Sequence, residues 1–486
     1  MSRFLVMDVV FYGSSLNYDQ GSGNYQELKK ITRWDGRQYT LVSKYALRYS
    51  MLNDSGVFGR ELAPGEVFIK DTGEKSKGDV FNPKPDVLFS GEILKYPEFD
   101  LFGYLITKSE PTQSRTAPVR ISHAVSMTPF YYDSHFNGNH WIAQRALKAG
   151  LTTKLEPNLF TVEEHYSYYI YTIVVDVDNV GKLSVFTTKM DDVKTVLDNL
   201  KAKGENAKKI EEYRTFFESN GKGKKKGNKE SALVNPLTLN SAEGKLEIAG
   251  VELEELKIIP IVDPTSNKKE VKVSLYEIQF DLGEEARRER VLKLVKAVLN
   301  LKRKIKGRTE FLAPELLILG IYKDKPYDSF KNRIQLLGEF EEEEYVEVEE
   351  KNGKIVKKIR RITTGENGTE EYIEEIVETK PENSGEKTVQ VKRRRSVSRK
   401  RTAIFEITGI SSSTPIYEYY NDDTVTSTKE KTKEHNSGSN DNKKEIHPIS
   451  MDRILNLLGE RLSNTTKEPQ QEIFIVKSSN VEVRLK

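Results

Sequence analysis

Hydrophobic and polar positions along the 486-residue chain predict both strands and helices. Residues 4–12 form a nearly continuous apolar run, which is typical of a buried strand. Residues 166–177 give the strongest strand signal, because almost all of them are aromatic or β-branched. Residues 42–52 and 284–305 have helical spacing, and the second of these begins acidic and ends basic, as the helix dipole favours. We expect further strands at 101–107, 119–127, 271–282, 314–322 and 473–476, and further helices at 142–148, 191–203 and 451–462.

The core elements follow the order strand, helix, strand, strand, helix, strand. This is the β-α-β-β-α-β order of ferredoxin-like folds and of RNA-recognition sheets. It requires that residues 53–100, 128–164, 180–270 and 339–446 be insertions. We therefore predict an α+β protein with a modified ferredoxin-like, RNA-recognition-motif core and large insertions.

Composition narrows the classes of function. Lys and Arg number 77 against 74 Asp and Glu, a net charge of +3, so any anionic partner must be held by a local basic face. The chain has no cysteine, which excludes disulfides, zinc ribbons, iron–sulfur clusters and thiol nucleophiles. No apolar stretch is long enough to span a bilayer, and the N-terminus lacks a signal-peptide cleavage site. We expect a cytoplasmic protein that has no membrane partner.

Two segments could hold a phosphate backbone. The loop at 13–24, GSSLNYDQGSGN, offers backbone amides and small side chains, although a plain strand–helix connection is equally favoured. Ser43 is a candidate N-cap, and Lys44 and Arg48 follow it one helical turn apart, either as a phosphate clamp or as solvated surface charges. Strand alternation puts Arg120 and Ser122 on one face, where they suit a polynucleotide backbone or simply a polar edge strand.

Catalytic and metal signals are weak. Among six histidines, His135 and His140 lie beside Asp133, and polar loop residues are the preferred interpretation over a metal site. The sequence contains no HExxH, Walker A, GxSxG or dinucleotide-binding motif. We expect no metal and no cofactor.

Charge is segregated in the C-terminal third. Residues 339–350 contain eight Glu, and residues 391–401 contain seven basic residues and no acid, so a long charged hairpin is expected between them. The basic run could bind duplex or displaced DNA, but pairing with the Glu block is slightly favoured. Residues 201–230 form a basic loop, and 421–446 form a polar linker. The candidate DNA-binding residues are Arg393, Arg394, Arg395 and Arg399.

Several blocks together resemble a known family, the DevR-type repeat-associated (RAMP) proteins that form the backbone of the type I-B CRISPR Cascade surveillance complex. The most specific block is RTAPVRISHAVSMTPFYYDSHF at 115–136. The resemblance covers most of residues 1–330 and does not include 339–446. The remaining blocks are Ser15-Leu16-Asn17, VSKYALR at 42–48, LFGY at 101–104, HYSYYIYTIVVDVDNVG at 165–181, and residues 287–301 with 314–320.

The resemblance implies a hand-shaped RNA-recognition fold. Its parts would be a first palm half at 1–52, a finger insertion at 53–110, a palm strand at 111–127, a thumb at 128–164, a second palm half at 165–338, a charged insertion at 339–401 and a C-terminal segment at 402–486. The thumb would fold over the guide through Phe130, Tyr131 and Phe136. The RNA-binding residues would be Ser14, Ser15, Asn17, Ser43, Lys44, Arg48, Arg115, Arg120, Ser122 and His123.

The function that this implies is structural rather than enzymatic. Copies of the chain would polymerise along one CRISPR RNA (crRNA) and support base pairing to invading target DNA in antiviral defence. The partners would be crRNA, target DNA, further copies, other Cascade subunits and a recruited nuclease. One alternative is a RAMP endoribonuclease, for guide processing or type III-like target RNA cleavage, with His123 and Asp19 as the candidate residues. The other is a generic single-stranded RNA-binding protein without cooperativity.

Overall fold

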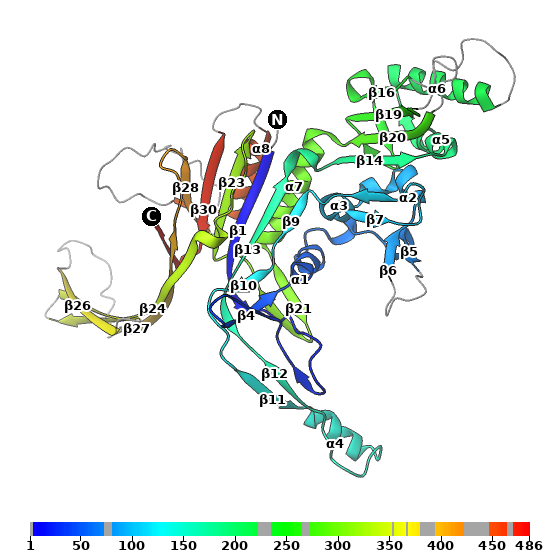
Figure 1. The fold of residues 1–486 in the computed structure, drawn as a ribbon. Helices are drawn as coiled ribbons and strands as arrows, with labels where there is room; N and C mark the ends of the chain where they lie inside the picture. Colours follow the sequence, from blue (N-terminus) through cyan, green and yellow to red (C-terminus); the bar gives the residue numbers. More distant parts are fainter. Residues whose placement is uncertain are drawn as a thin grey trace, which may run out of the picture.

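A ten-stranded mixed sheet forms the centre of the molecule in the computed structural model (Figure 1). The structure describes residues 3–71, 80–221, 235–264, 273–351, 354–365, 368–379, 394–421, 447–463 and 470–486. The strand order is β29-β28-β30-β23-β1-β13-β10-β4-β3, and β9 also pairs with β13. These strands are β1 (Arg3–Ser14), β3 (Lys30–Thr32), β4 (Gln38–Val42), β9 (Val119–Ile121), β10 (Ala124–Ser126), β13 (Tyr166–Asp176), β23 (Leu316–Lys323), β28 (Ile416–Asn421), β29 (His447–Ile449) and β30 (Gln471–Lys477).

Strand β1 lies between β13 and β23 and is antiparallel to both. Val9, for example, is opposite Tyr171 on one side and Leu317 on the other. Both faces of β1 are covered: Leu5, Met7, Val9 and Phe11 pack into one hydrophobic cluster and Val10 into another. This burial explains why the strand is a continuous apolar run rather than an alternating one.

Helices cover one face of this sheet. They are α1 (Lys44–Tyr49) with the π-helical turn η1 (Ser50–Asp54), α7 (Gly283–Leu299) and α8 (Met451–Ser463). The predicted cap is confirmed, since the Ser43 hydroxyl accepts a hydrogen bond from the Ala46 amide at 3.2 Å. The predicted helix at 284–305 is wrong beyond Leu299. A hairpin of β21 (Lys302–Ile305) and β22 (Arg308–Phe311) follows, because Lys306 and Gly307 form its turn with positive φ.

A second hydrophobic cluster joins two segments that are far apart in sequence. Residues from 67–106, which we expected to be an irregular finger insertion, pack with residues from 183–282, which we expected within the second half of the palm. The predicted strand at 271–282 is real but belongs to this second sheet, β14-β20-β19-β16, and not to the central one. The elements are β5 (Phe68–Asp71), β6 (Val80–Pro83), α2 (Asp86–Phe89), α3 (Pro97–Phe102), β7 (Tyr104–Ile106), β8 (Gln113–Arg115), β14 (Lys182–Thr187), α5 (Met190–Asn199), β15 (Leu200–Ala202), α6 (Glu205–Gly221), β16 (Leu237–Asn240), β17 (Leu246–Ile248), β18 (Val251–Glu252), β19 (Glu255–Val262) and β20 (Val273–Asp281).

Two expected strands differ in detail. The segment at 101–107 begins as helix α3, for which Pro97 supplies the first turn, and only then becomes β7. The segment at 119–127 is split into β9 and β10 at Ser122 and His123. The other expected helices and strands are present, with ends that shift by a few residues.

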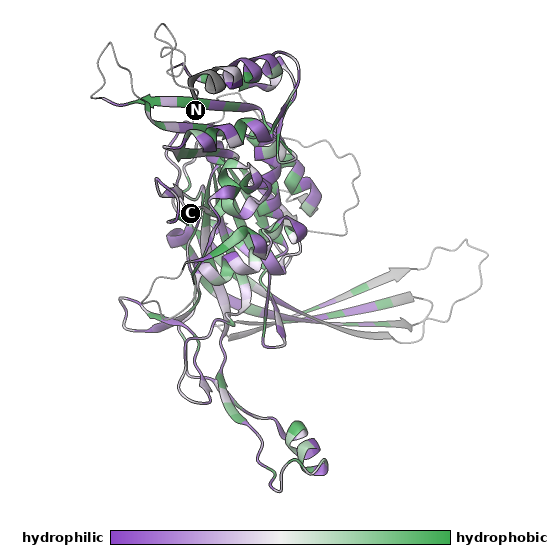
Figure 2. Ribbon diagram, turned by 90° about the vertical axis from the view of Figure 1, so that its right-hand side faces the viewer, coloured by the Kyte–Doolittle hydropathy of each residue, from purple (hydrophilic) through white to green (hydrophobic). Residues whose placement is uncertain are grey.

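Two arms project from this body (Figure 2). One consists of β11 (Ser134–Gly138), α4 (His140–Lys148) and β12 (Leu159–Glu163), with β2 (Tyr25–Gln26) paired at its base. We call it the thumb arm. The other, the charged arm, is a sheet of the order β26-β25-β24-β27-β31, where we had expected a simple hairpin. Its strands are β24 (Ile334–Lys351), β25 (Lys354–Gly365), β26 (Gly368–Thr379), β27 (Arg394–Ile407) and β31 (Val481–Leu485).

Some predictions fall outside the described residues. These are residues 222–230 of the predicted basic loop, the linker at 422–446, and Arg393. The described part of that loop prediction is wrong, because residues 200–202 form β15 and residues 205–221 form helix α6. For Arg394, Arg395 and Arg399 only the backbone in β27 is described. Within the described chain, no helix combines the length and the apolar character that crossing a membrane requires.

Candidate nucleic-acid interface

A cluster of cations surrounds the break between β9 and β10. The Nδ1 atom of His123 accepts a hydrogen bond from the Lys44 backbone amide at 2.9 Å. The ammonium of Lys331 donates to the Ser122 hydroxyl and to the His123 carbonyl, both at 2.9 Å. Burial, reinforced by the charges of Lys44, Lys331 and Lys29, lowers the pKa of His123 below its usual 6.5. The imidazole is therefore neutral at neutral pH, and the ammonium groups carry the positive charge.

Beneath this cluster lies a buried carboxyl group, Asp8 in β1. It accepts hydrogen bonds from the Thr172 hydroxyl at 2.6 Å, the Ser329 hydroxyl at 2.8 Å and the Phe330 amide at 2.6 Å. Burial raises the pKa of Asp8, and these hydrogen bonds oppose the shift. Burial also lowers the pKa of Lys331, while attraction to Asp8 acts in the other direction. Asp8 thus fixes the short helical turn that places the half-buried Lys331 against Ser122 and His123.

The start of α1 is held by the loop that precedes β2. The side-chain carbonyl of Asn17 accepts from the Ser43 amide at 2.7 Å. Lys44 is exposed at the first position of the helix, with its ammonium 5.2 Å from the ring of Tyr45, which is itself 69% exposed. Asn17 and Ser43 therefore position the helix, and Lys44 is the residue that a ligand can reach.

The phosphate-cradle prediction for the 13–24 loop needs correction. Ser14 and Ser15 are almost fully buried, so their hydroxyls are not on the surface. The guanidinium of Arg303 donates twice to the Leu16 carbonyl, at 2.9 and 2.8 Å, and holds Leu16 at a φ of 40°. Residues 14–17 are therefore buried and support α1, whereas residues 19–24 are exposed and remain accessible.

Two predicted cations are engaged inside the protein. Arg115 forms an ion pair with Asp100 and donates to the carbonyl groups of Lys182 and Asn179. Arg48 lies with its guanidinium 4.9 Å from the Phe102 ring, and burial lowers its pKa. Arg115 joins β8 to α3 and β14, and Arg48 joins α1 to α3. Neither is a free phosphate ligand.

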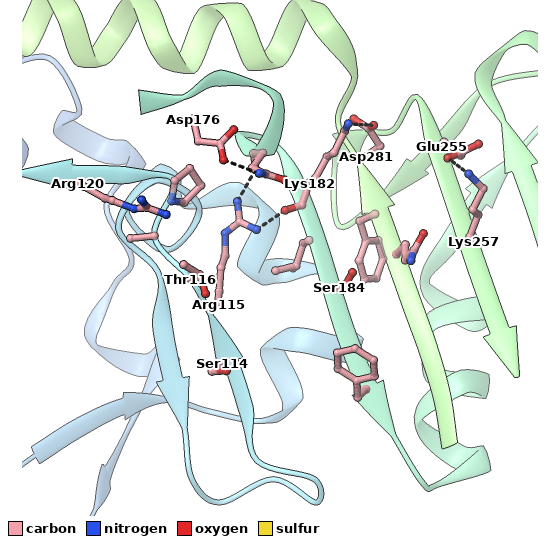
Figure 3. Close-up of a pocket in the computed structure, with 17 residues that line it drawn as sticks. Ser114, Arg115, Thr116, Arg120, Asp176, Lys182, Ser184, Glu255, Lys257 and Asp281 are labelled. Carbon is pink, nitrogen blue, oxygen red and sulfur yellow. Dashed lines mark hydrogen bonds and ion pairs between the residues drawn. The ribbon is translucent and has the colours of Figure 1, made fainter. Parts of the chain in front are cut away.

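Arg120 and Ser122 share one face, as strand alternation predicts. Arg120 is opposite Val174 in the register, and Ser122 exchanges hydrogen bonds with Thr172, two residues along β13. Ser122 contacts the cation cluster, whereas Arg120 is exposed at the edge of a groove of about 580 Å³ (Figure 3). This face of β9 therefore connects the cluster to the groove.

The groove lies between β9 and the second sheet, and most of its charges are neutralised. Lys257 pairs with Glu255 at 2.5 Å, and the ammonium of Lys182 is 3.9 Å from Asp281. Arg120 is the cation in the groove for which the described part of the chain supplies no ion-pair partner. Ser114, Ser184 and Gln279 add uncharged hydrogen-bonding groups. Among the described residues that line it, the groove thus offers Arg120 as an unpaired cation in a polar channel.

Exposed aromatic side chains lie at the β3–β4 turn and along the thumb arm. Trp34, at the turn between β3 and β4, is 98% exposed. Tyr131 is 74% exposed and Phe136 71% exposed, and Trp141 on α4 adds a third large ring along the thumb arm. Phe130 differs, because it packs edge-on against His165 and lies 4.8 Å from the Lys30 ammonium, and so belongs to the base of the thumb arm. Exposed rings beside cations are the usual stacking platforms for single-stranded nucleic acids.

A second cavity, of about 530 Å³, lies where the thumb arm meets the body. Tyr18 and Phe160 line it together with several amide side chains and Lys306 and Arg308. Glu163 ties this region together by accepting from the Leu28 amide and the Lys30 ammonium, both at 2.8 Å. The cavity has the mixture of rings and amides that could hold a nucleobase.

Three important residues were missed by sequence reasoning. They are Lys331 and Lys29, which contribute charge near His123, and Arg303, which binds the Leu16 carbonyl. Their segments carry no motif, and only the tertiary fold brings them to the interface. The weak metal candidate is not supported: within the described residues, no group of three or more His, Cys, Asp or Glu could hold a metal ion. His135 instead pairs with Glu164 at 2.8 Å.

Comparisons with known proteins give the family. A profile for the CRISPR-associated negative auto-regulator DevR/Csa2 matches residues 5–350. No curated protein sequence matches the chain. One similar solved chain comes from a "CRISPR RNA-guided surveillance complex, pre-nicking", with 9% identity, 68% of this chain and 81% of that chain covered, and a TM-score of 0.34. Another, from a "CRISPR RNA-guided surveillance complex", has 10% identity, coverage of 68% and 73%, and a TM-score of 0.30.

Neither structural similarity is close enough to carry a conclusion about this chain. The profile match is of a different kind, because it extends over well more than half of the 486 residues. It includes β1, α1, the thumb arm, β13, α7 and β23. The chain belongs to the CRISPR-associated DevR/Csa2 family.

Proposed function

We propose that this protein is the guide-RNA-binding backbone subunit of a Cascade-type complex. Copies of it line up along one crRNA and hold the guide so that it can pair with target DNA. The observation that carries the proposal is the cation cluster of Lys44, Lys331 and Lys29, together with exposed aromatic rings on the thumb arm, in a member of a CRISPR-associated family. Cations hold phosphates and rings stack bases without selecting a sequence, as a backbone subunit requires.

The strand order supports a ferredoxin-like palm. β23, β1, β13 and the β9/β10 pair lie side by side in the 4-1-3-2 order, with α1 and α7 as the two connecting helices. In an RNA-recognition fold, RNA lies on the sheet face opposite the helices. Asp8, Thr172, Ser122 and Arg120 belong to that opposite face, where Asp8 and Thr172 are buried and Arg120 at its edge is exposed. The proposed path of the guide runs from the cation cluster toward the groove that Arg120 borders.

Contacts with target DNA, other Cascade subunits and a recruited nuclease complete the proposal. In this scheme the protein supplies shape and charge, while base pairing supplies sequence recognition. DNA binding by Arg394, Arg395 and Arg399 stays a prediction. The backbone register places this basic strand opposite the Glu block, which favours the pairing alternative.

The experiment that tests the proposal measures binding of purified protein to single-stranded RNAs of unrelated sequence. We expect cooperative, sequence-independent binding that weakens steeply as salt rises, because phosphate contacts release counterions. Binding to one sequence only, or binding that salt does not change, would contradict a backbone role.

One observation favours the alternative function, an endoribonuclease. The neutral imidazole of His123, whose pKa is lowered by burial and by the charges of Lys44 and Lys331, has the protonation state that a general base needs. We propose that it positions Lys44 and does not cleave RNA. The His123→Ala variant should still support guide-directed DNA binding, and neither variant nor wild type should cut repeat or target RNA. A cut that disappears in His123→Ala would establish the enzyme instead.

A further inference from the structure

The charged arm alternates in sign from strand to strand. β26 carries five Glu and no basic residue, whereas β25 is rich in Lys and Arg. β24 holds the Glu block, and the part of β27 at 394–401 holds five basic residues and no acid. The register pairs these strands in the order acidic, basic, acidic, basic. Ion pairs bridge the strands, such as Arg360 with Glu371 and Arg361 with Glu344.

Both outer strands of the arm have an open edge among the described residues. β26 pairs with β25 alone over its whole length. β27 pairs with β31 only from Ala403 to Ile407, so residues 394–402 have β24 as their one neighbour. Open edges of this length invite another strand. Tyr372 and Ile373, on the open strand β26, are 55% and 66% exposed.

The charges decide which edges can meet. A two-fold contact would put β26 against β26, acid against acid, or β27 against β27, base against base, and like charges on neighbouring strands repel. Only β26 of one copy against β27 of another joins opposite charges and continues the alternation. Each of the four strands β26, β25, β24 and β27 is antiparallel to its neighbour in the arm. β26 and β27 therefore run in opposite directions. Copies related by a simple displacement would therefore meet in antiparallel fashion, in the same pattern as within the arm.

We propose that the charged arm is a self-association element, in which β26 of one copy adds to the basic edge of β27 in the next copy. This contact is head-to-tail and open-ended, so it can repeat along a row of copies. It would reinforce the proposed RNA filament but does not require RNA. The other candidate for the basic edge, a nucleic acid, would leave the acidic edge without a partner.

The test uses the natural absence of cysteine in the chain. Two single variants of the full protein are made, Tyr372→Cys on β26 and Lys400→Cys at the open part of β27. They are mixed in RNA-free buffer with a flexible bismaleimide linker. We expect a crosslinked dimer in the mixture and only monomer in each variant alone. As a matched control, Lys208→Cys on the exposed face of α6 should give no dimer with Tyr372→Cys.

Salt and RNA complete the design. Crosslinking should fall several-fold between low and high salt, because exposed charges select the contact. No dimer in the mixture, or a Tyr372→Cys dimer formed by itself, would overturn the proposal. If the mixture gives no dimer and the wild type still coats RNA, the arm inference fails while the proposed function stands. Loss of DNA affinity on arm deletion, without any dimer, would assign the basic edge to nucleic acid.

Discussion

At the scale of single residues, the interface depends on how buried groups place exposed ones. Asp8 is buried in β1 and accepts from the Phe330 amide, so the next residue, the half-buried Lys331, lies with its ammonium at the His123 carbonyl. Asn17 accepts from the Ser43 amide and sets the position of Lys44. The two lysines come from segments almost 300 residues apart in the chain and converge on one histidine. Each should therefore contribute separately to RNA binding.

We predict that Lys44→Ala and Lys331→Ala each weaken RNA binding for all sequences. Each substitution should lower the slope of log affinity against log salt by about 1, because one phosphate contact is lost. Fluorescence anisotropy over a salt series measures both quantities. Lys208→Ala, on the exposed face of α6, is the control and should change neither. Arg48 is not part of this test, because it packs on Phe102 and its loss would disturb the fold. Equal slopes for wild type and both variants would remove these lysines from the interface.

Two histidines predict how stability depends on pH. Burial lowers the pKa of His165, whose Nδ1 shares a hydrogen bond with the Thr40 hydroxyl at 2.7 Å, and burial together with lysine charges lowers the pKa of His123. Both are neutral when folded and gain protons more readily when unfolded. Their contribution to the free energy of unfolding should therefore be fully present above pH 6.5, the usual pKa of histidine, and should be lost as the pH falls below that value.

Urea unfolding at about pH 7.5 and about pH 5.5 measures this loss, since protonation of the two unfolded imidazoles drives it. The His165→Gln variant should lose less stability between the two pH values than wild type does. If the variant and wild type lose the same amount, His165 is not a source of the pH dependence.

At the scale of elements, local patterns predicted what the long buried strands and helices are, and failed where distant segments meet. The apolar runs of β1 and β13 and the stripe on α7 are local signals, and they are present in the structure. The second core was not predictable in this way, because α3 and β20 are joined only by the tertiary fold. From the sequence we predicted that Arg115 binds RNA. In the structure it forms an ion pair with Asp100 and donates to the Lys182 carbonyl. We predicted that Ser14 and Ser15 line a surface loop, but both are buried beside Leu16, whose carbonyl accepts from Arg303.

The charged arm yields a prediction at this scale. Its root pairs residues 334–340 with 402–407, and Ile334, Phe405 and Ile407 belong to a hydrophobic cluster of the body. Replacing residues 341–401 by an Asn-Gly turn should keep this root and leave the thermal midpoint within a few degrees of wild type. The shortened protein should still coat guide RNA. Circular dichroism melting measures the first expectation, and a broad or non-cooperative melt would show that the arm is part of the folding unit.

At the scale of the whole molecule, a near-neutral chain must concentrate its binding surface. The central sheet and its neighbouring segments supply the cation cluster, the thumb arm supplies exposed rings, and the charged arm projects in a different direction from the thumb arm. The exposed rings Tyr131, Phe136 and Trp141 have no cover within the described part of the chain, so a single copy leaves them in water. Large exposed apolar groups on a projecting arm mark an interaction surface. Adjacent copies on one RNA would give that surface a partner.

The most direct test of the central claim is the mass of the RNA-bound assembly as a function of RNA length. The protein is mixed with single-stranded RNAs of increasing length and unrelated sequence, and native mass spectrometry counts the copies bound to each. A guide-coating backbone subunit predicts that copy number rises in proportion to length, at a constant number of nucleotides per copy, with few partly filled RNAs at limiting protein. A single copy on every RNA, or copies distributed at random along it, would contradict the account.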